Sequence, residues 1–336
     1  SAMLSHILDQ SPWKCNAFLG GIASNTNSNL LLNKQSEWVV VEADEFDRSF
    51  LHLSPFASIV TAIDPDHLDV YGDVSSFTDG FRQYAMKIDP NGVCIVKEGI
   101  SLPTLCPTVS YGIDSETADY NGYNLSYIDG EMQFFVDTKS SRRVRFHLGL
   151  PGIHNVSNAL ACIALLDQLG LPMADIQRGL ASFKGVKRRF DVQIKTSDLV
   201  YIDDYAHHPE ELKSLIDSLR MMYPEQQINA VFQPHLYSRT RDFGNAFSEQ
   251  LSRFDSLILL PIYPAREPEI IGVSSEWLLS MVHLKDKEVL SATGVLEVMK
   301  QKTKGVIVTI GAGDIGEIVA PLKNILIQNS KSNGHF

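Results

Sequence analysis

The sequence has few cysteines and no long apolar segment. No uninterrupted apolar run in its 336 residues approaches the ~20 residues of a membrane-spanning helix, so we expect no contact with a membrane. The chain begins without the basic and apolar stretches of a secretory signal peptide. No C-x-x-C pair occurs, which argues against a disulfide framework or a structural zinc site. We therefore expect a cytoplasmic protein with four reduced thiols: Cys15, Cys94, Cys106 and Cys162.

Basic residues are fewer than acidic ones. The chain has 29 Lys and Arg against 40 Asp and Glu, which gives a net charge of −11. Nonspecific binding of DNA or RNA needs a basic face, so we expect no nucleic-acid partner. The sequence also lacks a G-x-x-x-x-G-K-[ST] segment, which excludes a Walker-type phosphate loop within these residues. The charge balance stays compatible with a local basic pocket for an anionic substrate.

The length predicts about two domains of ~100–200 residues each. Short β-branched runs in the first half predict buried, parallel strands at 38–41, 57–62 and 93–96. A meander of hairpins is predicted next at 123–128, 132–137 and 144–148, with Asp129-Gly130 as the clearest turn. Helices are predicted at 155–169 and 172–183.

Strands and helices alternate regularly in the second half, which predicts a doubly wound sheet. The expected strands are 199–202, 228–232, 256–260, 288–290 and 305–309. The expected helices lie near 209–222, 240–254, 274–283, 294–302 and 314–328. The boundary falls in the Gly- and Lys/Arg-rich segment 183–190. We therefore expect a first domain over 1–188, a second over 189–328 and a polar tail over 329–336.

Two acidic segments follow predicted strands of the first domain. The first runs from Glu42 to Asp47, and the second contains His67 among three aspartates at 64–69. We expect the ends of the strands at 38–41 and 57–62 to be adjacent, which brings Glu42 and His67 to one crevice, where they suit Mg²⁺ or Mn²⁺ beside phosphates. The alternative for the first segment is an acidic, solvated loop, and for His67 a solvated loop histidine.

Two further segments of the first domain carry candidate nucleotide contacts. Asn155 and Asn158 are three residues apart on one helix face, where their amides suit a nucleobase edge; on spacing alone, Asn155 as a helix cap is favoured. The segment from Lys187 to Asp191 includes Arg189 and suits a phosphate clamp. A solvated basic linker is the alternative.

Three polar segments follow predicted strands of the second domain, where ligands of α/β sheets bind. Asp204, Tyr205, His207 and His208 lie in 203–209, and a zinc site there lacks a second pair of ligands. The segments 233–241 and 262–267 offer arginines for anionic groups, among them Arg239 and Arg266.

A glycine-rich segment, 311–316, matches G-x-G-x-x-G between a strand and a helix. A dinucleotide fingerprint needs a second strand with an acid ~20 residues later, and none is evident. We therefore favour a tight turn whose amides line the crevice over a nicotinamide site.

These segments, in this order, resemble the Mur ligases of peptidoglycan synthesis, which serves cell wall formation, cell shape and division. The likeness lies in EADEFDRSFLHL, TAIDPDHLDVYG, GIHNVSNALA, FKGVKRRFD, DDYAHHPEEL, FQPHLYSRTRDF, IYPAREPE and TIGAGDIG. It implies an α/β chain: a central ATPase domain, with a parallel sheet and a small antiparallel meander, then a Rossmann-like, doubly wound C-terminal domain.

The resemblance also implies two absences. Family members carry an N-terminal UDP-sugar domain, and a phosphate loop directly precedes the helix that Ser1–Leu8 resembles. We expect this chain to begin just after that loop, and expect these residues alone to be inactive and to bind ATP poorly.

The resemblance implies ATP-dependent amide formation through an acyl phosphate. The motifs are most similar to the branch that joins L-alanine to UDP-N-acetylmuramate. Two alternatives stay open: a sister ligase that adds another amino acid or a murein tripeptide, and a non-catalytic nucleotide-binding fragment. The implied cofactors are ATP and Mg²⁺, or Mn²⁺ in its place.

The family's site residues map onto this chain by resemblance. Glu42 and His67 hold the metal, and Asn155 and Asn158 contact adenine. Arg189 and Asp204 hold the nucleotide from the C-terminal domain. The expected substrate contacts are Tyr205, His207, His208, Arg239 and Arg266. Catalytic roles are expected for Glu42, His67, Arg189, Asp204 and His207. Leu236 departs from the arginine that some relatives have there, and leucine cannot contact an anion by charge.

Overall fold

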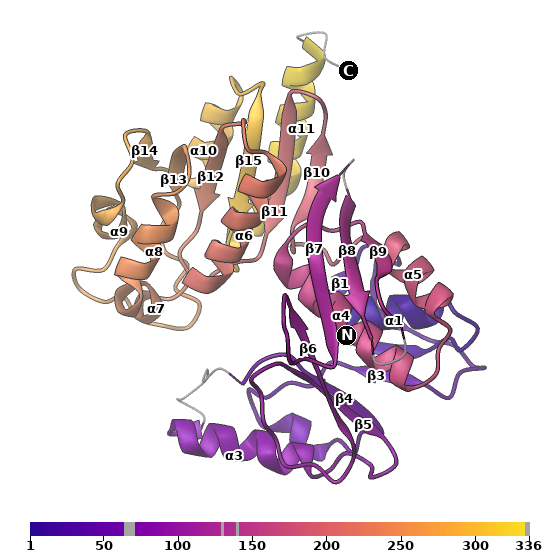
Figure 1. Ribbon diagram of the computed structural model, residues 1–336. Coiled ribbons are helices and arrows are strands. Elements are labelled where there is room, and N and C mark those ends of the chain that lie inside the picture. Colours follow the sequence, from indigo (N-terminus) through magenta and orange to yellow (C-terminus); the bar gives the residue numbers. More distant parts are fainter. Residues whose placement is uncertain (64–70, 129–130, 139–140, 333–336) are drawn as a thin grey trace. The chain divides into compact units, whose positions relative to one another are not determined.

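The computed structural model describes residues 1–63, 71–128, 131–138 and 141–332, and the chain divides into two compact units (Figure 1). Unit 1 is Ser1–Gly185 and unit 2 is Val186–Phe336. The division lies at residue 185 rather than 188, still inside the Gly- and Lys/Arg-rich segment. Within the described part of the chain, no helix is long and apolar enough to cross a membrane.

The described residues of unit 1 form a three-stranded and a six-stranded sheet. A three-stranded sheet has the order β2-β1-β3, formed by β1 (Asn16–Ala23), β2 (Ser28–Leu31) and β3 (Val39–Val41). A six-stranded sheet has the order β4-β5-β6-β7-β8-β9. Its strands are β4 (Ala57–Val60), β5 (Val93–Lys97), β6 (Thr108–Ile113), β7 (Tyr120–Ile128), β8 (Glu131–Asp137) and β9 (Val144–Leu148).

The six-stranded sheet combines both predicted pairing types. Strands β4 to β7 pair in parallel, whereas β7, β8 and β9 pair antiparallel as the expected meander. The expected Asp129-Gly130 turn lies outside the described residues. One expectation is wrong: β3 and β4, taken as neighbouring buried strands, belong to different sheets, and Val39 and Val41 are exposed.

The α-helices that the structure describes in unit 1 pack against these sheets. They are α1 (Ala2–Asp9), α3 (Val74–Ala85), α4 (Ile153–Gln168) and α5 (Met173–Ser182). Helix α4 is buried at Val156 and along 159–166 and packs on β5, β6 and β7. Helices α1 and α5 touch at Gly179, where a Cβ would lie 2.8 Å from the Cα of Ile7. The 3₁₀ helix η1 (Ser49–His52) follows the acidic segment.

Unit 2 is built on one six-stranded sheet with the order β10-β11-β15-β12-β13-β14. The strands are β10 (Asp191–Lys195), β11 (Leu199–Asp204), β12 (Ile228–Phe232), β13 (Ser256–Leu259), β14 (Lys287–Val289) and β15 (Gly305–Ile310). All neighbours pair in parallel except β10, which pairs antiparallel with β11. Strand β10 was not predicted from the sequence.

The helices of unit 2 follow the strands in turn. They are α6 (Pro209–Met222), α7 (Tyr237–Asp242), α8 (Gly244–Leu251), α9 (Ser275–Met281), α10 (Ala292–Met299) and α11 (Val319–Ser332), with the 3₁₀ helix η2 (Asp314–Ile318) before α11. Where one helix was expected at 240–254, two occur. They meet at Gly244, whose missing side chain leaves room for Trp277.

Apolar clusters cover both faces of this sheet, which confirms the doubly wound arrangement. One cluster joins alternate strand residues to α6, α8 and α9, and the other joins the opposite face to α10 and α11. Helix α11 runs to Ser332, so the chain is still helical where a polar tail was expected to begin. The Nδ2 of Asn329 donates to the carbonyls of Met299 (3.0 Å) and Lys302 (2.9 Å), which ties this end of α11 to α10.

Candidate functional site

Polar segments that follow four parallel strands lie at one edge of the unit 2 sheet. Segment 205–208 follows β11, 233–239 follows β12, 260–267 follows β13, and 311–316 follows β15. A parallel bridge joins His235 to Tyr263, and Gly311 N donates to the Asp204 carbonyl at 3.0 Å. The strand order therefore brings Asp204, Tyr205, His207 and Arg239 into one neighbourhood, as the strand-end rule predicts.

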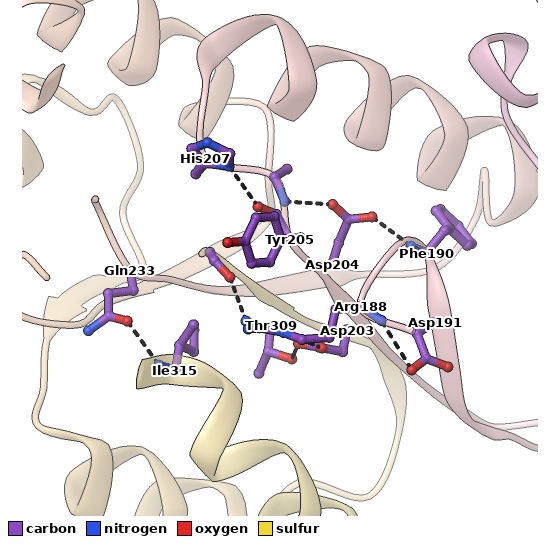
Figure 2. Close-up of polar contacts among 12 residues, drawn as sticks. Arg188, Phe190, Asp191, Asp203, Asp204, Tyr205, His207, Gln233, Thr309 and Ile315 are labelled. Carbon is purple, nitrogen blue, oxygen red and sulfur yellow. Dashed lines mark hydrogen bonds and ion pairs between the residues drawn. The ribbon is translucent and has the colours of Figure 1, made fainter. Parts of the chain in front are cut away.

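Asp204 is buried, and backbone amides occupy both of its carboxylate oxygens (Figure 2). Oδ2 accepts from Phe190 N at 2.7 Å, and Oδ1 accepts from Ala206 N at 2.8 Å. Burial raises the pKa of Asp204 to about 6, although these two hydrogen bonds act in the opposite direction. Asp204 therefore ties the entry to β10 to the loop after β11.

His207 has a defined tautomer and a lowered pKa. Its Nδ1 lies 3.0 Å from the Tyr205 carbonyl and 3.2 Å from Glu211 Oε2. Both neighbours accept, so Nδ1 carries the hydrogen and Nε2 carries the lone pair. Burial lowers the pKa of His207, opposed in part by the Glu211 charge, so the imidazole is neutral at pH 7.

Aromatic rings connect the three strand-end segments. The His207 ring lies 5.4 Å from the Tyr205 ring and 5.7 Å from the His235 ring, which stacks on Tyr263 at 5.5 Å. Burial lowers the pKa of His235 to about 4, with the neighbouring His207 and Arg239 charges acting in the same direction. His208 is the N-cap of α6, and its ring lies 4.6 Å from Phe243.

Arg188 and Arg189 flank the Tyr205 ring, with guanidinium carbons 5.0 and 5.2 Å from its centroid. Arg189 is exposed and pairs with Glu211 at 3.3 Å. The Arg188 side chain lies against the glycine-rich turn, where its Nη2 donates to the Gly311 carbonyl at 2.7 Å. The predicted basic segment is therefore part of unit 2 and not a solvated linker.

Leu236 has a left-handed backbone, with φ of 69°, at the start of α7. Its amide donates to the Tyr263 carbonyl at 2.9 Å, and its carbonyl accepts from Thr240 N and Oγ1. These bonds hold a conformation that is costly for a residue with a Cβ. Arg239 follows on α7 and is half-buried, whereas Arg266 is exposed.

Gln233 organises the glycine-rich turn (Figure 2). Its Oε1 accepts from Ile315 N at 2.9 Å, and its Nε2 donates to Asp314 Oδ1 at 2.6 Å. A Cβ at Gly313 would lie 2.5 Å from Gln233 Oε1. The glycines thus permit close packing of side chains from other segments, as expected for a tight strand-to-helix turn. Gln233, Asp314 and Ile315 also line a cavity of about 250 Å³.

The acidic segment of unit 1 is an ordered loop. Glu42 is exposed; its Oε2 accepts from Gly20 N at 3.1 Å and also from Ser1 Oγ. Asp44 and Asp47 accept from the amides of Phe46 and Ser49. His67 lies outside the described residues, and because β3 and β4 belong to separate sheets, strand adjacency does not bring Glu42 to it. In the described ranges, no three His, Cys, Asp or Glu residues are placed to hold a metal ion.

The two candidate adenine contacts lie in the first turns of α4. Gly152, with φ of 99°, is the N-cap, so the expectation that Asn155 caps this helix is wrong. Asn155 Nδ2 instead donates to the Pro151 carbonyl at 2.6 Å. Asn158 is exposed, one turn further along the helix.

Two family models match the chain. The Mur ligase middle domain matches residues 3–166, and the Mur ligase, glutamate ligase domain matches residues 188–314. A UDP-N-acetylmuramate–L-alanine ligase from Cytophaga hutchinsonii is 42% identical over 341 residues, covering 99% of this chain and 73% of that protein. The chain belongs to the Mur ligase family.

Solved structures of Mur ligases have the same fold. The UDP-N-acetylmuramate–alanine ligase of Thermotoga maritima has a TM-score of 0.80 at 25% identity, covering 99% of this chain and 72% of that one. The MurF ligase of Thermotoga maritima in complex with ADP has a TM-score of 0.73 at 16% identity, over 97% of this chain and 78% of that one. Mur ligases are ATP-dependent, and this chain has their middle and C-terminal domains.

Sequence reasoning about this Mur ligase chain missed Arg188, Asp203 and Gln233 as organisers of the site. Arg188 is next to Arg189, and Asp203 is next to Asp204, which were both predicted site residues. Gln233 directly follows the predicted strand 228–232. Residue type and spacing could not separate the members of the Arg188–Arg189 or Asp203–Asp204 pairs, because only the packing around each side chain distinguishes them.

Proposed function

We propose that this Mur ligase chain serves the ATP-dependent joining of L-alanine to UDP-N-acetylmuramate. The observation that carries the proposal is 42% identity, along 99% of the chain, to a protein named for that reaction. The arrangement of unit 2 supports it, because a neutral imidazole and guanidinium groups occupy the sheet edge where α/β folds bind ligands.

The reaction has two steps. A carboxylate oxygen of UDP-N-acetylmuramate attacks the γ-phosphorus of ATP, which forms an acyl phosphate and releases ADP. The ammonium group of L-alanine loses one proton to become the attacking amine. The amine attacks the acyl carbon, phosphate leaves, and a second proton is lost as the amide forms, which keeps one N–H. Both steps bring anions together, so the guanidinium groups of Arg189 and Arg239 offset repulsion.

His207 is suited to accept a proton from the alanine ammonium group. Its lowered pKa keeps it neutral at pH 7, and its Nε2 carries the lone pair. Tyr205 and His208 flank it on the same loop and contact the amino acid in this proposal. Arg266 is exposed on the segment after β13 and contacts the anionic substrate.

The nucleotide contacts are proposed residue by residue. Asn155 and Asn158 contact adenine from the first turns of α4, and Arg189 binds the phosphates. Asp204 supports this role indirectly, because its oxygens already hold the amides of Phe190 and Ala206 and thereby position Arg189.

Glu42 and His67 are the proposed residues for Mg²⁺, with Mn²⁺ as the alternative. Glu42 fits such an ion because it is an exposed carboxylate at a strand end, and Mg²⁺ commonly takes one or two carboxylates with phosphate oxygens and waters. When bound, the ion offsets the charge of the phosphates. We also propose the cytoplasm, where ATP is available, as the location.

Phosphate release tests the proposal directly. The full-length product of the gene and the 336-residue chain are assayed side by side with ATP, UDP-N-acetylmuramate and a panel of amino acids and murein tripeptide. Selective stimulation by L-alanine in the full-length product is the expected result. Preference for another amino acid or the tripeptide would identify a sister ligase, and no stimulated release would leave a nucleotide-binding protein without this activity.

A further inference from the structure

Two consecutive arginines of unit 2 are held in different ways. The Arg189 side chain is 53% exposed, whereas that of Arg188 is 31% exposed and faces a carboxylate that is 1% exposed. Arg188 has a left-handed φ of 62°, which turns its side chain away from the direction that an extended strand would give it. The environment of the Arg188 side chain therefore differs from that of the neighbouring Arg189.

Arg188 joins its own segment to two others, the end of β11 and the turn after β15 (Figure 2). Its carbonyl accepts from Tyr205 N at 2.6 Å, directly after β11. Its Nη2 donates to the Gly311 carbonyl at 2.7 Å, directly after β15. Its Nε lies 3.4 Å from Asp203 Oδ2, an ion pair rather than a hydrogen bond. These contacts leave the guanidinium little freedom to follow a substrate.

A buried chain of hydroxyl groups fixes the carboxylate that faces Arg188. Thr309 Oγ1 donates to Asp203 Oδ1 at 2.7 Å, and Tyr201 OH lies 3.1 Å from Thr309 Oγ1. Because the Thr309 hydrogen is used by Asp203, the Tyr201 hydroxyl donates to Thr309. Asp203 and Thr309 are direct partners in the β11–β15 register, so the sheet itself fixes the position of the anion.

The same guanidinium stacks on the Tyr205 ring, 5.0 Å from its centroid, with Arg189 at 5.2 Å. It also fills the space above Gly316, where a Cβ would lie 2.9 Å from its Cζ. Arg188 thus holds the Tyr205 ring and the glycine-rich turn at once.

We propose that Arg188 is a positioning residue for the amino-acid substrate: it acts through Tyr205 and the 311–316 turn and does not itself bind substrate. The proposal rests on the proposed function, in which Tyr205 contacts L-alanine. It predicts a selective effect, because a misplaced Tyr205 weakens binding of the amino acid and leaves the nucleotide contacts of Arg189 in place.

Two variants replace or displace the Arg188 guanidinium and leave the Tyr205 loop and the 311–316 turn in place. Arg188→Lys keeps the charge but loses the planar fork that reaches Gly311 and Asp203 together. Gly316→Ala displaces the guanidinium by its new methyl group, and this displacement is tolerable because the neighbour is the end of a flexible side chain. Gly294→Ala on α10 is the matched control, because Gly294 has no contact to Arg188.

The test is steady-state kinetics of the full-length product with each substrate varied in turn. In Arg188→Lys and Gly316→Ala, we expect the KM for L-alanine to rise about tenfold or more, because small misplacements of a binding group have effects of this size. The KM for ATP and kcat should stay within about threefold of wild type. Gly294→Ala should leave all three unchanged.

Other outcomes contradict the proposal. An equal loss of kcat for all substrates, with every KM unchanged, would assign Arg188 a purely structural role. A selective rise in the KM for ATP would make it a nucleotide contact. If wild type itself prefers another amino acid, the proposed function fails while Arg188 is judged on the KM for that amino acid.

A second measurement does not depend on activity and can be made even if the wild-type protein is inactive. In the 336-residue chain with Tyr205→Trp as reporter, Gly316→Ala should increase acrylamide quenching of the added tryptophan fluorescence, and Gly294→Ala should not. Unchanged quenching in Gly316→Ala would overturn the positioning role whatever the activity.

Discussion

Carboxylate side chains that are close in the sequence have different environments in this chain. Glu42 and Asp44 are exposed in one loop, and Asp44 is used by the loop itself. Asp203 and Asp204 are consecutive and buried, yet the first faces Arg188 and the second binds two amides. The role of each acid therefore follows from its immediate neighbours.

Glu42→Gln should reduce turnover of the full-length product by about 100-fold, because a metal contact supplies several kcal/mol of charge stabilisation. The amide keeps an acceptor for Gly20 N, so loss of charge is isolated from loss of the loop contact. The measurement is kcat/KM across a Mg²⁺ titration, with His67→Ala tested in parallel. Asp44→Asn, which keeps its acceptor for Phe46 N, is the control; equal effects of both changes would refute the metal role of Glu42.

The raised pKa of Asp204 predicts a pH dependence of stability. Its pKa is ~3.9 in an unfolded chain and about 6 in the fold. Between these values the folded chain keeps a proton that the unfolded chain has released, so stability falls as pH rises from ~4 to ~6 and then levels off. The free energy of unfolding of wild type, relative to Asp204→Asn, should decrease by on the order of 2–3 kcal/mol over this window.

Urea unfolding of both proteins across this pH range measures the difference. Asp286→Asn, at an exposed position, corrects for the general effect of removing an acid. A relative stability that is constant or increases with pH would contradict the assignment of a buried, proton-retaining Asp204.

Many residues of the candidate site lie at the ends of helices and strands. His208 caps α6, Gly152 caps α4, and the unusual backbone of Leu236 begins α7. The bounds of β12 and α6 agree with the sequence prediction, because each has a clean apolar pattern between strong boundary residues. The far end of α11 differs, since polar side chains there form specific contacts that periodicity does not report.

Asn329→Ala should lower the free energy of unfolding by about 1–2 kcal/mol, because it removes two hydrogen bonds to carbonyls at the end of α10. Thermal or urea unfolding gives the value. Asn324→Ala, at an exposed position of the same helix, should have a smaller effect. A neutral Asn329→Ala would mean that these two hydrogen bonds do not stabilise the fold.

The whole chain consists of two units with separate cores. In unit 2, helices from within the unit cover both faces of one sheet. The net charge of −11 is compatible with anionic substrates because placed arginines, such as Arg189 and Arg239, supply local positive charge. The absence of nucleic-acid partners remains a prediction from this charge.

Residues 186–336, expressed alone, should fold, since their sheet needs no strand or helix from unit 1 to bury its apolar faces. Circular dichroism should show one cooperative thermal transition with loss of near-ultraviolet signal from packed aromatic residues. The 336-residue chain, measured beside it, should contain that same transition. A non-cooperative melt of 186–336 would mean that unit 1 is required for its folding.

The sequence by itself determined the α/β class, the meander, the repeated β-α order and the family, because hydrophobic period and motif order are local properties of the chain. It also placed Asp204, Tyr205 and His207 at a sheet edge, since parallel strands put their following loops on one side. Tertiary structure decided which strands are neighbours. It separated β3 from β4 and thereby removed the strand argument for pairing Glu42 with His67.

Only the tertiary structure distinguished the members of each pair of identical residues. Arg188 differs from Arg189, and Asp203 from Asp204, through contacts with Gly311, Tyr205 and Thr309 that come from distant segments. Burial and pairing depend on atoms that the fold brings together, whereas residue type and spacing depend on the chain alone. For that reason the sequence identified the segments of the candidate site, and only the packing showed which contacts each side chain makes within them.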